Sequence, residues 1–107
     1  MSNDRRRSAR VEILGRVRGH AVSLDTSVIV RDISLVGMAI ETPFAFPTDA
    51  VHAFRLTLGD GAYVVLQGRA RHSRVLTGPD ETARYLTGFE FVDDGPSAVG
   101  DLVNRIG

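Results

Sequence analysis

Four arginines lie close together near the start of this 107-residue chain: Arg5, Arg6, Arg7 and Arg10. The planar fork of an arginine matches the paired oxygens of a phosphate and the O6/N7 edge of guanine, and its flat face stacks on a purine ring. Grouped guanidinium ions therefore suit a small anionic guanine nucleotide. A short arginine run is also typical of a solvated basic tail, so this segment alone does not establish a site.

A second polar group lies further along the chain, in Asp32-Ile33-Ser34-Leu35-Val36-Gly37. Its composition predicts a tight turn between apolar strands, with Asp32 and Ser34 on the same side. A carboxylate accepts hydrogen bonds from the N1/N2 edge of guanine, and a hydroxyl donates or accepts. Gly37 permits either a positive φ or a close approach of backbone amides to a phosphate. The alternative is that Asp32 and Ser34 only satisfy the backbone of the turn.

The remaining polar residues do not predict catalysis or metal binding. His20, His52 and His72 are scattered without the spacing of metal ligands, so we expect neither a metal nor a catalytic role for them. Ser34 has no histidine or lysine placed by a motif to activate it as a nucleophile. Residues 93–96 are more typical of a helix start than of a metal site. The sequence therefore predicts no enzyme, no cofactor and no metal.

Length and composition predict one domain with a single modest core. The apolar content of 43% is ordinary for a globular protein. The absence of cysteine excludes disulfides and thiolate chemistry and suits a reducing cytoplasm. Because no apolar run approaches the roughly 20 residues that span a bilayer, and the N-terminus is polar, we expect a cytoplasmic protein without membrane insertion.

The net charge is zero, but the charges are unevenly distributed. Residues 1–20 carry six arginines and two acids, a balance of +4, whereas residues 77–107 carry six acids and two arginines, a balance of −4. The basic start predicts an anionic partner. The neutral total, the acidic C-terminal third and the low aromatic content of 7% argue against nucleic-acid binding as the main function.

The apolar pattern predicts mostly β-structure. Strand-like stretches cover residues 11–18, 28–30, 38–40, 51–58, 62–75 and 84–92. We expect Gly19-His20 to bend the chain and Gly59-Asp60-Gly61 to form a hairpin loop. In the stretch 51–58, Val51, Ala53 and the pair Leu56/Leu58 are expected to form the apolar set. Four large apolar side chains are expected in the core or at its rim: Met38, Phe44, Phe46 and Phe54.

This number of strands, with glycine-, aspartate- and proline-containing turns, predicts a small antiparallel barrel or a closed sandwich. A barrel is favoured because an open sheet would leave its edges exposed. Residues 96–106 fit a short C-terminal α-helix with Pro96 in its first turn. We expect residues 1–8 to form a mobile basic arm and residues 9–107 to form the barrel domain with its helix.

The two polar elements, in this order and at this separation, resemble the PilZ domain, a bacterial receptor for cyclic di-GMP. The family pattern is Arg-x-x-x-Arg on an N-terminal arm, followed by Asp/Asn-x-Ser-x-x-Gly on the barrel. Residues 6–10 and 32–37 match both parts without substitution, and residues 88–91 look like the family's closing strand. The resemblance covers roughly residues 5–105 and implies a mainly β fold, a six-stranded antiparallel barrel of the split-barrel type.

The resemblance also implies roles for the residues of both elements. Arg6 and Arg10 would contact phosphate and the Hoogsteen edge of guanine. Asp32 and Ser34 would address guanine and phosphate from the barrel surface, and Gly37 would leave room for the ligand. These five residues are the main predicted contacts for cyclic di-GMP.

Two further arginines and the output follow from the same resemblance. Arg5 resembles the residue of members that take an intercalated pair of cyclic di-GMP molecules, whereas Arg7 is either an auxiliary contact or a spectator. The implied function is a receptor that changes the conformation of its arm and signals to a separate protein. The alternatives are a PilZ-like protein adaptor that binds no nucleotide, and non-specific nucleic-acid contact through the arm.

Overall fold

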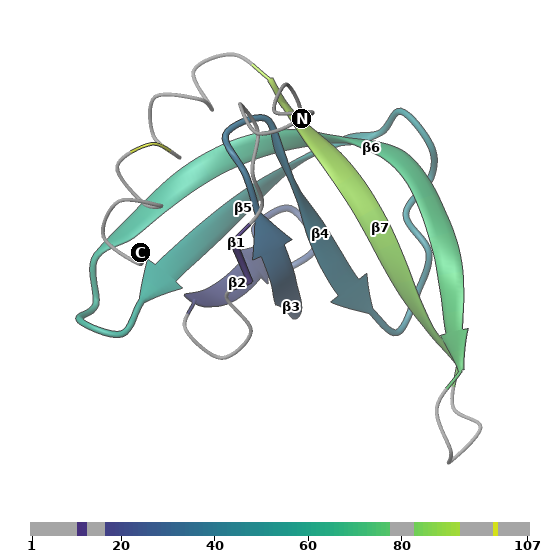
Figure 1. Cartoon of the computed structure of the whole chain (residues 1–107), viewed down its shortest axis with the longest axis horizontal. Helices are drawn as coiled ribbons and strands as arrows, with labels where there is room; N and C mark the ends of the chain where they lie inside the picture. Colours follow the sequence, from purple (N-terminus) through teal and green to yellow (C-terminus); the bar gives the residue numbers. More distant parts are fainter. Residues whose placement is uncertain (1–10, 13–16, 78–82, 93–99, 101–107) are drawn as a thin grey trace, which may run out of the picture.

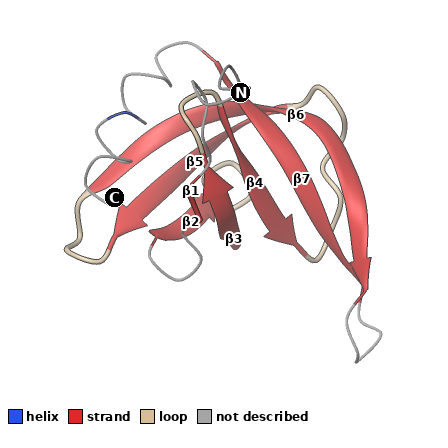
Figure 2. Ribbon diagram, viewed as in Figure 1, coloured by secondary structure: helices blue, strands red, loops and turns tan. Residues whose placement is uncertain are grey.

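The computed structural model describes residues 11, 12, 17–77, 83–92 and 100 (Figures 1 and 2). Within these residues the strands are β1 (Val11–Glu12), β2 (Val17–Ala21), β3 (Thr26–Ile33), β4 (Gly37–Thr42), β5 (Val51–Leu58), β6 (Tyr63–Thr77) and β7 (Ala83–Val92). The predicted arm lies outside the described residues, and so does the predicted helix apart from Gly100. In the part of the chain that is described, no helix has the length and apolar character to cross a bilayer.

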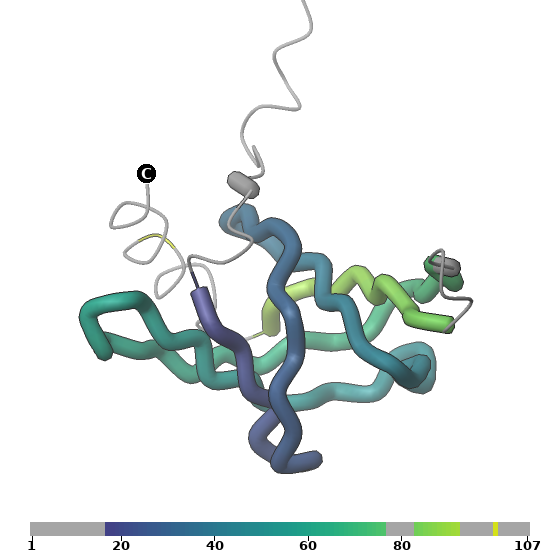
Figure 3. The backbone as a smooth tube through the Cα atoms, turned by 90° about the horizontal axis from the view of Figure 1, so that it is seen from below, coloured from purple at the N-terminus to yellow at the C-terminus, as the bar shows by residue number. Residues whose placement is uncertain are grey.

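Six of these strands close into a barrel. Each neighbouring pair is antiparallel in the order β3–β2–β5–β6–β7–β4, and β4 pairs again with β3 to complete the ring. Closure pairs both edges of the sheet, and the β3–β4 turn projects at one end of the barrel (Figure 3). The strand β1 adds two residues to β3, with Val11 opposite Ile33 and Glu12 opposite Asp32. The predicted six-stranded antiparallel barrel is confirmed.

Alternating side chains place one face of each long strand inside the barrel. In β3, Val28 and Val30 are buried while Ile29 between them is exposed. The fully buried ring of Phe54 packs edge-to-face on Phe89, with 4.9 Å between the ring centroids. Aromatic packing of this kind fixes β5 against β7 across the barrel interior.

The large apolar side chains that the sequence assigned to the core or its rim are found there. Met38 and Phe54 are completely buried, Phe46 is nearly so, and Phe44 packs against the core while partly exposed. The ring of Phe46 lies 5.1 Å from that of Phe44, centroid to centroid. This prediction is confirmed.

The predicted bend at Gly19-His20 is wrong, because both residues lie within β2. A Cβ atom on Gly19 would lie 2.8 Å from a methyl carbon of Val28 and 2.8 Å from one of Val30. These two valines fill the interior space that a side chain at Gly19 would need. The glycine is therefore explained by core packing, not by a turn.

The predicted apolar face of β5 is right for Leu56 but wrong for Val51 and Ala53. Phe54 and Leu56 point inward, whereas Val51 points outward with 41% of its surface exposed and Ala53 is half-buried. The hairpin loop at residues 59–61 is confirmed: the β5–β6 turn closes through backbone hydrogen bonds, and the Asp60 carboxylate accepts one from the Ala62 amide.

The strand β6 serves two parts of the barrel surface. It is 15 residues long and curves across the molecule in Figure 1. Residues 63–69 pair with β5, whereas residues 70–77 pair with β7 alone. Residues 71–75 are all exposed. The second half of β6 therefore presents side chains to solvent beside β7 and β4.

Candidate functional site

The β3–β4 turn is held together by the side chain of Ser34. Its Oγ accepts hydrogen bonds from the amides of Val36 and Gly37, each at 3.2 Å, and donates to the Gly37 carbonyl oxygen at 3.3 Å. The Ser34 amide donates to the same carbonyl at 2.8 Å. Ser34 is 1% exposed, so its hydroxyl is used inside the turn, as the local-turn interpretation of the sequence predicts.

Gly37 allows β4 to approach β7 closely. A Cβ atom on Gly37 would lie 2.3 Å from the carbonyl oxygen of Phe89, a distance that no side chain can occupy. Of the two options that glycine permits here, a positive φ is not used, because Gly61 is the described glycine in that conformation. The amides of Val36 and Gly37 already have Ser34 as acceptor, so they do not form a phosphate-binding nest.

Four residues form one row across the outside of four neighbouring strands. Asp32 of β3 is opposite Ala39 of β4, Ala39 is opposite Gly88 of β7, and Gly88 is opposite His72 of β6. Residues paired in this way project from the same face of a sheet. The small residues make the middle of the row flat, and two ionisable side chains stand at its ends. We call these four residues the outer row.

A β-bulge precedes each end of the outer row. The register shifts at Arg31, immediately before Asp32, and at Arg71, immediately before His72. Bulges bend a strand and re-aim the side chains beside them, and they are frequent next to functional sites. Both bulged arginines are exposed. The two bulges therefore set how both ends of the row face the solvent.

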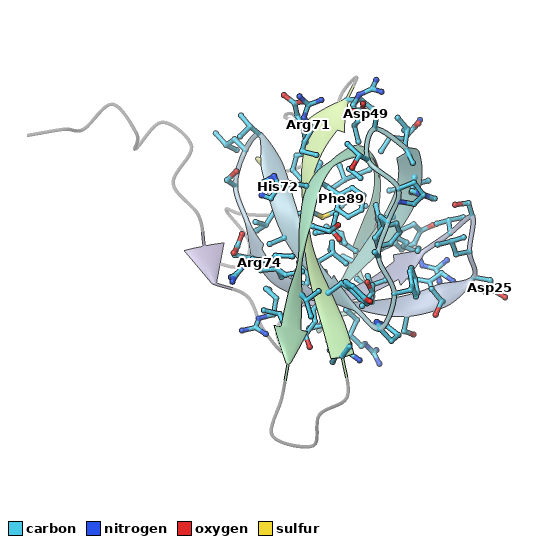
Figure 4. All side chains as sticks on the ribbon, turned by 90° about the vertical axis from the view of Figure 1, so that its right-hand side faces the viewer. Asp25, Asp49, Arg71, His72, Arg74 and Phe89 are labelled. Carbon is cyan, nitrogen blue, oxygen red and sulfur yellow. The ribbon has the colours of Figure 1, made fainter. Side chains whose placement is uncertain are left out.

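The imidazole of His72 lies over Gly88, where a Cβ atom would be 3.2 Å from the ring carbon Cε1. Figure 4 shows His72 and Arg74 on the outer side of β6, whereas Phe89 lies inside the barrel. A depression of about 240 Å³ lies between His72, Arg71 and the β3–β4 turn. This is less than the roughly 300–1,000 Å³ that encloses a drug-sized ligand, so a ligand here would lie on an open surface and not inside a cavity.

The charges around His72 are weakly paired. Arg71 lies 3.6 Å from an Asp49 carboxylate oxygen and 3.8 Å from a Glu90 carboxylate oxygen, with half of its side chain exposed. Contacts of this length on the surface contribute little free energy. Arg74 makes no ion pair with any residue that the structure describes. This end of the row can therefore offer cations to an anionic ligand.

A stronger ion pair network joins the strands beside the row. The Glu41 carboxylate accepts hydrogen bonds from Arg31 and Arg84, each at 2.6 Å, and its side chain is 13% exposed. Burial alone would raise the pKa of Glu41, but the hydrogen bonds from the two arginines and their positive charges outweigh burial and lower the pKa. Glu41 therefore stays ionised and links β3, β4 and β7.

The predicted barrel residues Asp32, Ser34 and Gly37 lie within one turn and the strands that flank it. The predicted arm residues lie outside the described part of the chain: Arg5, Arg6, Arg7 and Arg10. The sequence did not predict that His72 and Gly88 lie in the same cross-strand row as Asp32. Cross-strand register creates that row, and no local pattern in the sequence reports it.

Comparison with known families gives one match, the PilZ domain, over residues 4–106. This chain belongs to the PilZ domain family. The match spans nearly the whole sequence and confirms the resemblance carried by the two polar elements. PilZ domains are cyclic di-GMP receptors and adaptors, not enzymes. A comparison with curated proteins finds no match.

Solved structures share the fold at low sequence identity. MrkH from K. pneumonia in its apo state is 17% identical, with a TM-score of 0.71, over 98% of this chain and 51% of that chain. The PilZ domain of YcgR from Escherichia coli with c-di-GMP is 17% identical, with a TM-score of 0.67, over 96% and 88%. The Bacillus subtilis inhibitor of motility MotI/DgrA is 15% identical, with a TM-score of 0.64, over 95% and 51%. This PilZ chain thus spans about half the length of MrkH and MotI.

Proposed function

We propose that this PilZ protein is a receptor for cyclic di-GMP and that the ligand binds on the outer row. Two of the solved structures with the same fold, MrkH and the YcgR domain, contain c-di-GMP. A cyclic dinucleotide needs a flat surface for its bases and cations for its two phosphates. The outer row supplies the flat surface, and the arginine-rich N-terminal segment supplies the cations.

The junction between that segment and the barrel supports the proposal most directly. Val11 pairs with Ile33 in the antiparallel β1–β3 ladder, so the chain before Val11 joins the barrel where β3 enters its turn. An extended chain spans at most about 3.3–3.6 Å per residue. Arg10 and Arg6, which are one and five residues before Val11, therefore have Cα atoms within about 4 and 18 Å of it. Both guanidinium groups can reach the outer row.

Each side chain has a chemical role in this proposal. The Asp32 carboxylate accepts hydrogen bonds from guanine N1–H and N2–H. The His72 ring offers a face on which a base stacks. Arg6 and Arg10 bind the phosphates and the O6/N7 edge of guanine. Arg5 stacks on a second ligand molecule.

Three further residues were predicted to contact the ligand: Ser34, Gly37 and Arg7. Ser34 and Gly37 shape the turn, and a direct bond from Ser34 Oγ to the ligand would replace one of its bonds to the Val36 or Gly37 amide. Arg7 is an auxiliary contact. These roles are consistent with a turn that is preorganised before ligand arrives.

The energetics require several contacts to form together. Ordering about five arm residues costs about 5–10 kcal/mol of backbone entropy. Each charge-assisted hydrogen bond returns about 1.5–3 kcal/mol, so roughly four are needed for net binding. Two phosphates and two guanine edges provide that number. The output is a basic segment neutralised on the barrel, a change that a separate partner protein can distinguish.

Isothermal titration calorimetry of the full chain with cyclic di-GMP tests the proposal. We expect saturable binding with a micromolar or lower Kd, and a loss of at least about 100-fold in Arg10→Ala. Arg18→Ala, on the far side of the barrel, is the matched control and should bind as wild type. Arg5→Leu should lower the number of ligands bound per chain. No saturable heat with the wild-type chain would refute the receptor function.

One observation favours the alternative, an adaptor that binds no nucleotide. Ser34 satisfies the turn by itself, so this part of the motif has a use in the fold without ligand. Under that hypothesis Arg6 and Arg10 are not needed for association with the partner protein. An Arg6→Ala/Arg10→Ala variant that still supports partner association in cells, together with no calorimetric signal, would favour the adaptor.

A further inference from the structure

A second surface lies on the other side of the barrel from the outer row. In the closed order of strands, β2 and β5 are opposite β7 and β4. Arg18 of β2 is flanked by Ile29 of β3 and by Thr57 of β5, and Thr57 is opposite Tyr63 of β6. These four residues form one outward row. It is apolar at both ends and cationic within.

The next row on the same surface repeats this mixture. His20 of β2 is opposite Arg55 of β5, and Arg55 is opposite Val65 of β6. We call the surface formed by Arg18, Arg55, Ile29, Tyr63 and Val65 the arginine–apolar face. Its apolar members are all exposed, at 39% for Ile29, 62% for Tyr63 and 54% for Val65. Single exposed apolar residues are normal, but exposed apolar side chains that alternate with arginines across neighbouring strands are typical of an interaction surface.

The two arginines of this face differ from the paired arginines elsewhere. Neither Arg18 nor Arg55 forms an ion pair with a described residue, whereas Arg31 and Arg84 share the Glu41 carboxylate. Asp25, in the turn between β2 and β3, is hydrogen-bonded to His20 at 3.1 Å. The face therefore carries positive charge without a carboxylate of its own.

We propose that the arginine–apolar face docks an acidic protein surface that also presents apolar side chains. Tyrosine and arginine are enriched at protein interfaces, where a guanidinium gains most when its partner carboxylate is shielded from water by apolar neighbours. Symmetric pairing of two copies through this face would place arginine against arginine, which disfavours a homodimer. Exposed isoleucine and valine side chains beside the arginines do not suit a phosphate backbone. The proposal does not depend on nucleotide binding, because the two surfaces share no residue: this face is centred on β2 and β5, whereas the outer row is centred on β4 and β7.

Chemical-shift mapping on the ¹⁵N-labelled full chain tests this proposal with defined probes. The first probe is a short amphipathic peptide of leucine and glutamate, and the second is its lysine counterpart. We expect the acidic peptide alone to shift the amides of Arg18, Arg55 and Val65, and higher ionic strength to weaken binding. Arg55→Glu should weaken it at least about tenfold, and Val65→Thr, which keeps the β-branch, by a smaller factor.

Arg74→Glu is the matched control. Arg74 lies on β6 and, like Arg55 on β5, it is exposed and forms no ion pair with a described residue. This variant should bind the acidic peptide as wild type does. No shift with the acidic peptide, shifts confined to the N-terminal arginines, or equal binding by Arg55→Glu would overturn the proposal. Binding of single-stranded DNA or phosphatidylglycerol vesicles through Arg18 and Arg55 in place of the peptide would also overturn it.

Discussion

The interior of the β3–β4 turn and the outer row lie side by side, yet their residues have different tasks. Ser34 and Gly37 are both buried. The Ser34 hydroxyl is hydrogen-bonded to the backbone of the turn, and Gly37 lies against the backbone of β7. Asp32 and His72 stand on the outside of the same strands, each next to a bulge. A single sequence motif thus contains residues that hold the fold and a residue that faces the solvent. Substitutions should separate the two groups: interior changes should cost stability, and outer changes should cost ligand affinity.

The largest effect is expected at Gly37. In Gly37→Ala the new methyl group overlaps the Phe89 carbonyl oxygen, so β4 and β7 must separate. We expect a loss of at least about 3 kcal/mol in the free energy of unfolding, measured by urea denaturation. Gly59→Ala is the control, because a Cβ there meets no atom within 4 Å. Equal stability of the two variants would show that the contact of Gly37 with β7 is not tight.

The next effect is expected at Ser34. Ser34→Ala leaves the amides of Val36 and Gly37 without their acceptor in a buried turn, which should cost about 1–3 kcal/mol of stability. Ser27→Ala, at an exposed position of β3, the strand that leads into the turn, should change stability by less than about 0.5 kcal/mol. If Ser34→Ala keeps full stability but loses cyclic di-GMP binding, Ser34 belongs with the outer row.

Glu41 gives a pH-dependent test of the ion pair network that joins β3, β4 and β7 beside the outer row. Because its pKa is lowered in the folded state, its contribution to stability is present above the ordinary value of 4.5 and is lost as the pH falls through the folded-state pKa. Glu41→Gln should cost about 1–2 kcal/mol at neutral pH and lose less stability than wild type on acidification. Urea denaturation at several pH values measures both. Glu90→Gln, whose contact with Arg71 is long and exposed, should follow wild type.

The smallest effect is expected at His72. His72→Ala removes a stacking surface worth about 1–2 kcal/mol per base, so affinity for cyclic di-GMP should fall about 10-fold while stability is retained. His72→Phe should keep most of the affinity, and His20→Ala on the opposite side should change nothing. Calorimetric titration of the three variants with cyclic di-GMP measures the affinity, and urea denaturation measures the stability. A loss of stability without a loss of affinity in His72→Ala would move this residue from the ligand face to the fold.

Local sequence patterns predicted the barrel well and the site only in part. The loop at residues 59–61 and the turn that begins at Ser34 carry their own chemistry, so they were predictable. Gly37 is required by the Phe89 carbonyl oxygen on β7, which is distant in sequence, and the placement of His72 in one row with Asp32 depends on the register of four strands. Strand register follows from how the whole barrel closes, so neither could be predicted from neighbouring residues.

The central claim is that cyclic di-GMP binds on the outer row. A titration of the ¹⁵N-labelled full chain with this ligand, followed residue by residue by NMR, tests it most directly. We expect the amides of Asp32, Ala39, Gly88 and His72 to shift and saturate together, while those of Arg55 and Val65 stay unchanged. Saturable binding that shifts Arg55 and Val65 and leaves the outer row untouched would contradict it.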